Sequence, residues 1–321
     1  MSRALAVALT LAALPAVFSA HAFDLQGHRG ARGLAPENTL PSFQRALELG
    51  VTTLELDIAI TSDGVLVISH NPALNAEITR DAAGSFLEKD GPAIHSMTWD
   101  QVQAYRVGRI KPGTDYARQF PDQQPVDGTR IPRLSDLFDL VKRSGDEKVR
   151  FAIETKVRPD KPQETPAPEP FARAVVDEIR KAGMAGRSQI LSFDWRSLQV
   201  VQKIAPEIAT VYLTAQQRWL DNVGAGRPEG SSWTAGFQYR DYGSIPKMVK
   251  AAGGSHWSVY FGDLSPELAK EAQSLGLKVL VWTVNDPAIM ARMLGYGVDG
   301  LITDRPDLAR KLLEERNIRW R

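Results

Sequence analysis

Residues 53–70 read TLELDIAITSDGVLVISH, which is two strand patterns joined by a polar turn. The first pattern, Thr53–Ile58, alternates between apolar and polar positions, and the second, Val65–Ser69, is a short apolar run. Only the segment TSDG at 61–64 separates Ile60 from Val65. Parallel neighbours need a long crossover, whereas a short Asp-Gly loop forms a hairpin. The second strand is therefore predicted to run antiparallel to the first.

Strand patterns alternate with helical patterns along the chain of 321 residues. The predicted strands are Asp24–Gly27, Thr53–Ile58, Val65–Ser69, Val149–Glu154, Ser188–Ser192, Ala209–Leu213, Ser255–Val259, Lys278–Thr283 and Asp299–Thr303. Helices are predicted at Thr39–Leu49, Leu134–Arg143, Pro170–Ala182, Trp195–Ile204, Pro266–Leu275, Pro287–Tyr296 and Asp307–Arg316. Setting the hairpin strand aside leaves eight strands alternating with helices, as in an α/β protein with a parallel sheet. Eight strands favour a (β/α)8 TIM barrel over a doubly wound open sheet, for which a GxGxxG loop is also missing.

Two stretches interrupt the alternation. Residues 71–133 are rich in Gly, Pro, Asp and Gln and are too long for a plain loop. They are predicted to form a small insertion over the barrel mouth, within a single domain that spans 23–321. Residues 214–254 are predicted to be a second, smaller excursion.

The first 22 residues have the features of a secretory signal peptide. Arg3 precedes an apolar run at 4–18 that is too short to span a membrane comfortably, and Ala20-His21-Ala22 fits a small-x-small cleavage site. We therefore predict a periplasmic or secreted protein without a stable membrane anchor. Because the chain has no cysteine, disulfides and thiolate metal ligands are excluded.

The overall charge is close to neutral. The formal net charge is +1, and removal of Arg3 with the leader brings it near zero. Nucleic-acid binding usually requires a basic surface, so nucleic acid is not expected as a partner. The chain is expected to be a monomer or a homodimer.

Glu55 and Asp57 lie two positions apart in the first strand of the hairpin. Strand geometry points both to one face, about 6–7 Å apart along the strand. Two acids facing a barrel interior are costly unless a partner or a hard divalent cation compensates them. Solvated acids on an edge strand are the alternative interpretation. With the turn centred on Ser62-Asp63, the predicted register places His70 opposite Glu55, which favours a functional site.

Three further residues lie at the ends of predicted strands. Glu154 and Lys156 share one face at the end of the strand Val149–Glu154, and His28 follows the strand Asp24–Gly27. The carboxyl ends of barrel strands are where such enzymes keep their active sites.

These motifs resemble the glycerophosphodiester phosphodiesterase family, in its periplasmic type. The resemblance is carried by QGHRG at 26–30, APENT at 35–39, Glu55-Leu56-Asp57, Asp63-Gly64-x5-His70, Glu154-x-Lys156, Ser192-Phe193, WTVN at 282–285 and GVDGxxTD at 297–304. It covers residues 24–310, with 71–133 the least matched part.

The resemblance implies a TIM barrel with one divalent metal ion, Ca2+ or Mg2+. Glu55, Asp57 and Glu154 match the metal ligands of the family. His28 and His70 match its general acid/base pair.

Three more residues are given substrate-binding roles. Arg29 matches the phosphate-binding arginine of the family, and Lys156 its lysine. Trp282 ends a strand and is predicted to pack against the substrate, with a core role as the alternative. Asn71 departs from the family, which commonly has His-Asp where this chain has His70-Asn71. Asn38 and Thr39 are predicted to cap the helix that follows.

The predicted reaction is metal-dependent hydrolysis of a glycerophosphodiester to glycerol 3-phosphate and an alcohol. The divalent ion and an arginine stabilise the negative charge that builds up on the phosphate oxygens, while two imidazoles transfer protons. The alternatives are a phospholipase-D-like or phosphoinositide-cleaving enzyme on the same barrel, and a non-catalytic periplasmic binding protein.

Overall fold

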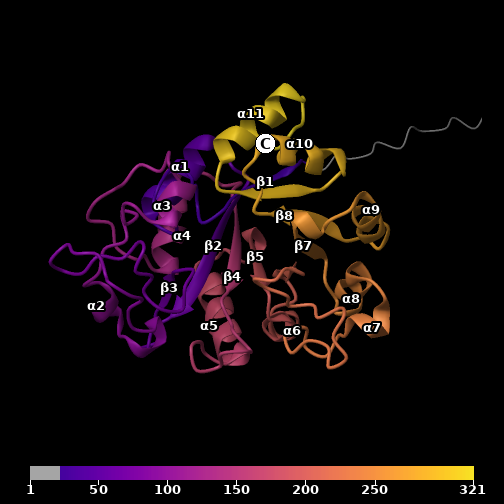
Figure 1. Ribbon diagram of the computed structural model, residues 1–321, viewed down its shortest axis with the longest axis horizontal. Helices are drawn as coiled ribbons and strands as arrows, with labels where there is room; N and C mark the ends of the chain where they lie inside the picture. Colours follow the sequence, from indigo (N-terminus) through magenta and orange to yellow (C-terminus); the bar gives the residue numbers. More distant parts are fainter. Residues whose placement is uncertain (1–21) are drawn as a thin grey trace, which may run out of the picture.

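The computed structural model describes residues 22–321, and its centre is a closed barrel of eight parallel strands (Figure 1). The barrel strands are β1 Asp24–Gly27, β2 Thr53–Ile60, β4 Arg150–Thr155, β5 Ser188–Ser192, β6 Ala209–Thr214, β7 His256–Tyr260, β8 Lys278–Trp282 and β9 Gly300–Thr303. Closure occurs because β1 pairs with both β2 and β9. The prediction of a (β/α)8 barrel is confirmed. Within the described residues no helix combines the length and the apolar character needed to cross a membrane.

Helices pack around the outside of the barrel because each carries one apolar face. They are α1 Leu40–Leu49, α4 Leu134–Ser144, α5 Pro168–Lys181, α6 Trp195–Ile204, α8 Ile245–Ala251, α9 Pro266–Ser274, α10 Pro287–Gly295 and α11 Pro306–Glu315. Phe138 of α4 meets Phe151 of β4 edge to face at 4.9 Å, and both rings are buried. The outward side chains of the strands therefore form the main core. A smaller apolar cluster fills part of the barrel interior, and inward side chains near the carboxyl ends of the strands build the site.

The helix α8 was not predicted, because its segment was assigned to the excursion at 214–254. It is only seven residues long, and its apolar pattern is correspondingly short. Ser244 caps it by accepting a hydrogen bond from the Lys247 amide, and Pro246 stands in its first turn. The short α7, Tyr239–Tyr242, immediately precedes it. The excursion itself therefore ends before Tyr239.

The strand β3, Leu66–Ile68, runs antiparallel to β2, as predicted, but the register is shifted by one residue. Ile58 pairs with Ile68, so the prediction that His70 lies directly opposite Glu55 is wrong. The turn has three residues instead of two, since Thr61 and Val65 close it through N–H···O bonds of 3.0 and 2.9 Å. Gly64 makes this loop possible at φ +82°, a left-handed conformation that glycine adopts without strain.

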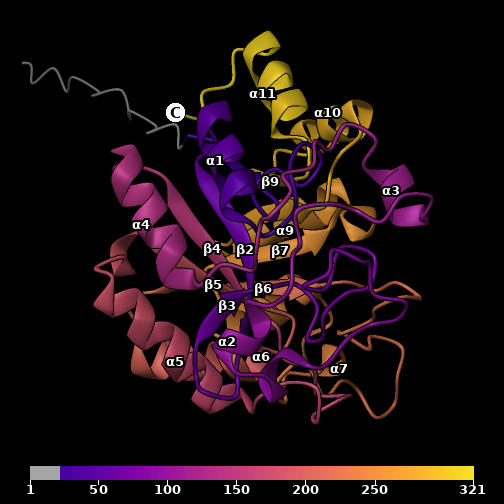
Figure 2. The ribbon, with the colours of Figure 1, turned by 90° about the vertical axis from the view of Figure 1, so that its left-hand side faces the viewer.

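Residues 71–133 form loops with a short 3-10 turn at Ile94–Ser96 and the short helices α2, Trp99–Val102, and α3, Asp115–Gln119. Figures 1 and 2 show this segment along one flank of the barrel beside β2 and β3. A separate apolar cluster holds it there, made of Ala59, Val67, Leu74, Ile94, Met97, Val102, Val107 and Ile131. The predicted leader, 1–22, lies almost wholly outside the described residues.

Candidate active site

A cavity with a volume of about 490 Å³ lies at the carboxyl end of the barrel. One half of its wall is polar and includes His28, Arg29, Glu55, His70 and Glu154. The other half is apolar and contains four aromatic rings, Phe193, Trp219, Trp233 and Trp282. The site is therefore a cleft with two chemically distinct sides.

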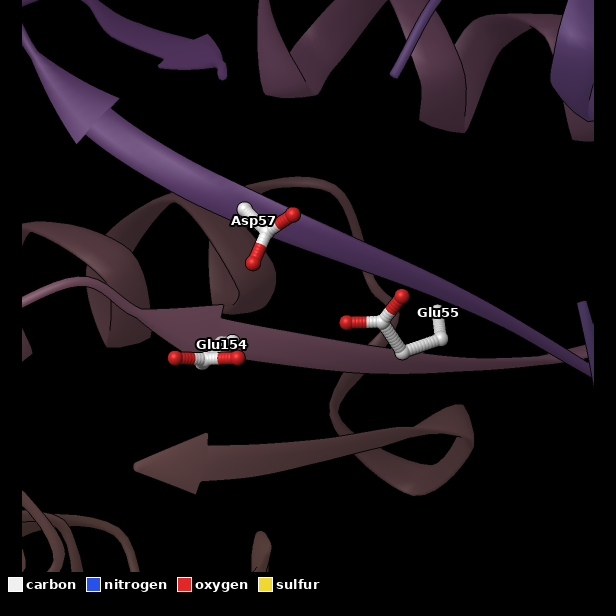
Figure 3. A group of neighbouring side chains, drawn as sticks. All are labelled: Glu55, Asp57 and Glu154. Carbon is white, nitrogen blue, oxygen red and sulfur yellow. The ribbon is translucent and has the colours of Figure 1, made fainter. Parts of the chain in front are cut away.

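Three carboxylates from two neighbouring strands converge in the polar half (Figure 3). Glu55 and Asp57 belong to β2, and Asp57 pairs in register with Glu154 of β4. One oxygen of each carboxylate lies within 4.8 Å of the others, and all three side chains are buried. This spacing allows a single ion to contact all three carboxylates.

Asp57 is held by two residues with unusual backbone conformations. Arg29 has φ +50° and Asn38 has φ +55°, a region that residues other than glycine rarely occupy. The Asn38 amide donates to Asp57 Oδ2 at 2.9 Å, and the Arg29 Nε lies 3.4 Å from the same oxygen. The other oxygen, Oδ1, is buried without a hydrogen-bond partner, and Lys156 Nζ lies 3.5 Å from it. A buried carboxylate oxygen that accepts no hydrogen bond fits a metal ligand.

The electrostatics of the three acids also favour a bound cation. Burial raises the pKa of Glu154 to about 7, against the opposing charge of Lys156. Burial and then the charge of Asp57 raise the pKa of Glu55 well above its usual value. Burial also opposes ionisation of Asp57, but His70, Lys156 and Arg29 hold its pKa below the usual range. Two of the three carboxylates thus lack enough positive charge nearby.

The balance of buried charges at the mouth also favours a bound cation. One connected network of buried ion pairs at the mouth comprises five carboxylates, Glu37, Glu55, Asp57, Glu154 and Asp304, and three cations, Arg29, Arg32 and Lys156. The carboxylates exceed the cations by two charges. One divalent cation would balance this excess, and oxygen ligands suit the hard ions Ca2+ and Mg2+. The residues present therefore fit such an ion.

His28 stands beside the carboxylates with its orientation fixed by Asp304. Its Nδ1 lies 2.7 Å from Asp304 Oδ1, and its Nε2 lies 3.9 Å from Glu55 Oε2. Asp304 also accepts bonds from Arg32 Nε at 2.7 Å and Asn285 Nδ2 at 2.7 Å. Burial lowers the pKa of His28, partly offset by the charge of Asp304. A neutral imidazole with a fixed Nδ1 proton leaves Nε2 available to the cleft.

His70 has a neutral partner in place of a charged one. Its Nδ1 lies 2.7 Å from the Oδ1 of Asn71, at the start of the insertion. Burial lowers the pKa of His70 well below its usual value, and Arg29 and Lys156 add to the effect. Asn71 therefore performs the orienting contact without adding negative charge.

The eight residues selected from the sequence all lie at this mouth. His28, Arg29, Glu55, His70, Glu154, Lys156 and Trp282 line the cavity, and Asp57 lies directly behind its wall. His70 reaches the site from the end of β3 although its predicted register was wrong. The shift leaves it two residues beyond the last paired residue, Ile68, where the loop is free to turn into the cleft.

Three contributing residues were missed. Asn38 was predicted to be a helix cap, but it binds Asp57, and Thr39 alone accepts the capping bond from Ser42. Glu37 was given no role and binds Arg29 Nη1 at 2.8 Å. Asp304, which orients His28, is the third missed residue. It is the last residue of the motif at 297–304, and this position was the signal in the sequence that could have identified it.

Comparison with known proteins agrees with this geometry. The model of the glycerophosphoryl diester phosphodiesterase family matches residues 28–308. The chain belongs to this family. A glycerophosphodiester phosphodiesterase from Caldanaerobacter subterraneus is 28% identical, with 87% of this chain and 93% of the relative covered.

Two solved structures extend the comparison. A putative glycerophosphoryl diester phosphodiesterase from Silicibacter pomeroyi is 37% identical, with a TM-score of 0.84 over 94% of this chain and 96% of the other. An Oleispira antarctica phosphodiesterase, solved in complex with sn-glycerol 3-phosphate, shares the fold at 19% identity and a TM-score of 0.63, with 91% of this chain and 97% of the other covered.

Proposed function

We propose that this protein hydrolyses glycerophosphodiesters to glycerol 3-phosphate and an alcohol, using one divalent ion held by Glu55, Asp57 and Glu154. Membership of the family supports the reaction, and the relatives named above carry that activity in their names. The observation that carries the proposal is the buried excess of two negative charges at a cleft that also contains two histidines.

The polar half of the cleft supplies the phosphate site. When bound, a divalent ion there supplies a positive charge for the phosphate oxygens as negative charge builds up on them. Arg29, fixed by Glu37 and by its own strained backbone, presents its guanidinium beside the acids. Lys156, 2.8 Å from Glu154, adds a second positive charge. Both are suited to orient a phosphodiester.

The two histidines supply the proton transfers. Each has Nδ1 engaged, His28 with Asp304 and His70 with Asn71, so each offers Nε2 to the cleft. One neutral imidazole removes the proton of the attacking oxygen at its Nε2. The other must first take up a proton at Nε2 from solvent, and this imidazolium then protonates the departing alkoxide. The attacking oxygen is either a water or the glycerol hydroxyl next to the phosphate.

The test is release of glycerol 3-phosphate, measured with a coupled assay on glycerophospho-choline, -ethanolamine, -glycerol and -inositol. Protein treated with EDTA is expected to be inactive, and activity is expected to return with Ca2+ or Mg2+. Lack of release from all four substrates with every metal would contradict the proposal.

We also propose that the protein acts in the periplasm or outside the cell, as a monomer or homodimer. Support comes from the apolar run at 4–18 and the Ala20-His21-Ala22 site. Amino-terminal sequencing of the protein from an exported fraction is expected to begin at Phe23, and an intact Met1 in all fractions would contradict export.

A further inference from the structure

The aromatic half of the cleft contains one ring that is largely exposed to solvent. Trp219 is 60% exposed, the most exposed large apolar side chain among the described residues. It lies 6.0 Å from Trp282 and 5.4 Å from Tyr260, measured between ring centroids, and both contacts are edge to face. Phe193 meets Trp282 in the same way at 5.2 Å. Successive rings stand nearly at right angles and form an aromatic corner, defined as Phe193, Trp219 and Trp282.

The conformation of its loop keeps the Trp219 side chain exposed. The loop folds back on itself through a bridge between Gln216 and Asp221 and a bond from the Gln217 amide to the Leu220 carbonyl at 2.9 Å. Asp263 fixes this turn by accepting from the Gln216 amide at 2.8 Å and the Gln217 side chain at 2.6 Å. A flexible loop would be free to cover the indole, whereas this one holds it at the rim.

The two halves of the cleft suit different parts of a phosphodiester substrate. Glycerol hydroxyls need hydrogen-bond partners, which the polar half provides around Arg29, Asn71 and Lys156. The aromatic corner offers ring faces instead, and it lies across the same cavity. The alcohol on the other side of the phosphorus therefore faces the corner.

Two cations near the corner are paired with acids. Lys156 Nζ lies 6.0 Å from the centre of the Phe193 ring and is paired with Glu154 at 2.8 Å. Asp263, which anchors the turn, has no cationic side chain within 4 Å among residues 22–321. Arg158, another cation that lines the cleft, is paired with Asp160 through bonds of 2.9 and 2.7 Å. Aromatic faces bind quaternary ammonium groups, which have no N–H to satisfy.

We infer that the aromatic corner is a subsite for the leaving alcohol and selects a trimethylammonium alcohol, making glycerophosphocholine the preferred substrate class. This inference rests on the proposed function. The zwitterionic substrate matches the cleft, with its phosphate over the cationic half and its ammonium against the rings.

The test compares kcat/KM for glycerol 3-phosphate release from three substrates: glycerophosphocholine, glycerophosphoglycerol and the 3,3-dimethylbutyl ester, in which carbon replaces the choline nitrogen. Glycerophosphocholine is expected to exceed the dimethylbutyl ester at least about fivefold. Trp219→Ala is expected to lower kcat/KM for glycerophosphocholine about tenfold, and Trp219→Phe is expected to lower it less. In Trp219→Ala, kcat/KM for glycerophosphoglycerol is expected to fall about twofold or less. Val126→Ala, at the other exposed apolar side chain, is the control and should leave the ratio unchanged.

The possible failures are distinguishable. Equal kcat/KM for the choline and dimethylbutyl substrates would show an apolar subsite and overturn the cation preference. An unchanged substrate ratio in Trp219→Ala would overturn the role of the corner. Release from none of the substrates would contradict the proposed function itself.

Discussion

The two ends of the barrel are both lined with charged side chains, but only the mouth leaves charge uncompensated. At the amino end, a cavity of about 350 Å³ is lined by three carboxylates, Asp24, Glu207 and Asp299, and by three permanent cations, Arg150, Arg187 and Lys278. At the mouth, the buried side chains that are joined by ion pairs, rather than all those that line the cavity, comprise five carboxylates and three cations. The amino end is balanced by its own residues, whereas the mouth requires an additional cation.

Two acids with similarly buried side chains, Asp24 and Glu154, show the difference. Burial opposes ionisation of Asp24, but Arg150 at 2.9 Å and the hydroxyls of Thr53 and Thr52 hold its pKa below the usual value. Burial raises the pKa of Glu154 to about 7 despite Lys156. A buried acid is therefore not by itself a sign of function; a buried acid that lacks enough partners is a much stronger one.

The largest expected effect follows from removing one mouth carboxylate. Glu154→Gln is nearly isosteric, but it lowers the negative charge facing the ion from three carboxylates to two. We expect loss of divalent-ion binding in calorimetry and a fall in kcat/KM of at least about a thousandfold. Retention of both metal affinity and turnover would show that the carboxylate excess has another purpose.

The next effect separates proton transfer from metal binding. His28→Ala and His70→Ala should each lower kcat by about 10²–10⁴-fold, since each removes one proton-transfer group. Ion affinity should stay within a few-fold of the unaltered protein, because neither imidazole is among the three converging carboxylates. Normal turnover in either variant would exclude that histidine from the chemistry.

A smaller effect concerns pH. In the metal-free protein the pKa of Glu154 is about 7, against an ordinary 4.5, so the folded state binds this proton more tightly than the unfolded chain. Relative to Glu154→Gln, the free energy of unfolding should therefore fall as pH rises from about 4.5 to about 7.

The ion must displace the same proton, so its affinity should increase at least about tenfold for each unit by which the pH rises toward about 7. Denaturant unfolding of both proteins and calorimetry across this range measure the two trends. A pH-independent affinity between pH 5 and 7 would contradict the raised pKa.

The smallest effect on activity is expected at the amino end. Asp24→Asn removes a balanced charge, so it should lower the free energy of unfolding by about 1–3 kcal/mol and leave kcat/KM and ion affinity unchanged. Urea unfolding and the coupled assay measure both. A loss of activity comparable with that of Glu154→Gln would remove the distinction between the two ends.

Much of this picture could be predicted from the sequence, because strand periodicity and a tight turn are local properties. The eight strands, the hairpin and the shared face of Glu55 and Asp57 follow from spacing alone. The register of the hairpin did not, since it depends on whether the loop has two or three residues, a choice made by the Thr61 hydroxyl and Gly64.

The residues missed in the sequence could not be predicted for a different reason, because their roles depend on the folded structure. Asn38 reads as a helix cap because it precedes Thr39 and a helical pattern, and only its left-handed backbone directs its amide to Asp57. Asp304 lies 276 positions from His28, so their contact exists only after the barrel closes. Trp219 is found in a loop without periodicity, and its exposure is visible only in three dimensions.

The most direct test of the central claim is to titrate metal-free protein with Ca2+ or Mg2+ while measuring bound ion and glycerol 3-phosphate release together. The account predicts that one ion binds per chain and that the rate rises in proportion to its occupancy. Full activity with no bound divalent ion would contradict it.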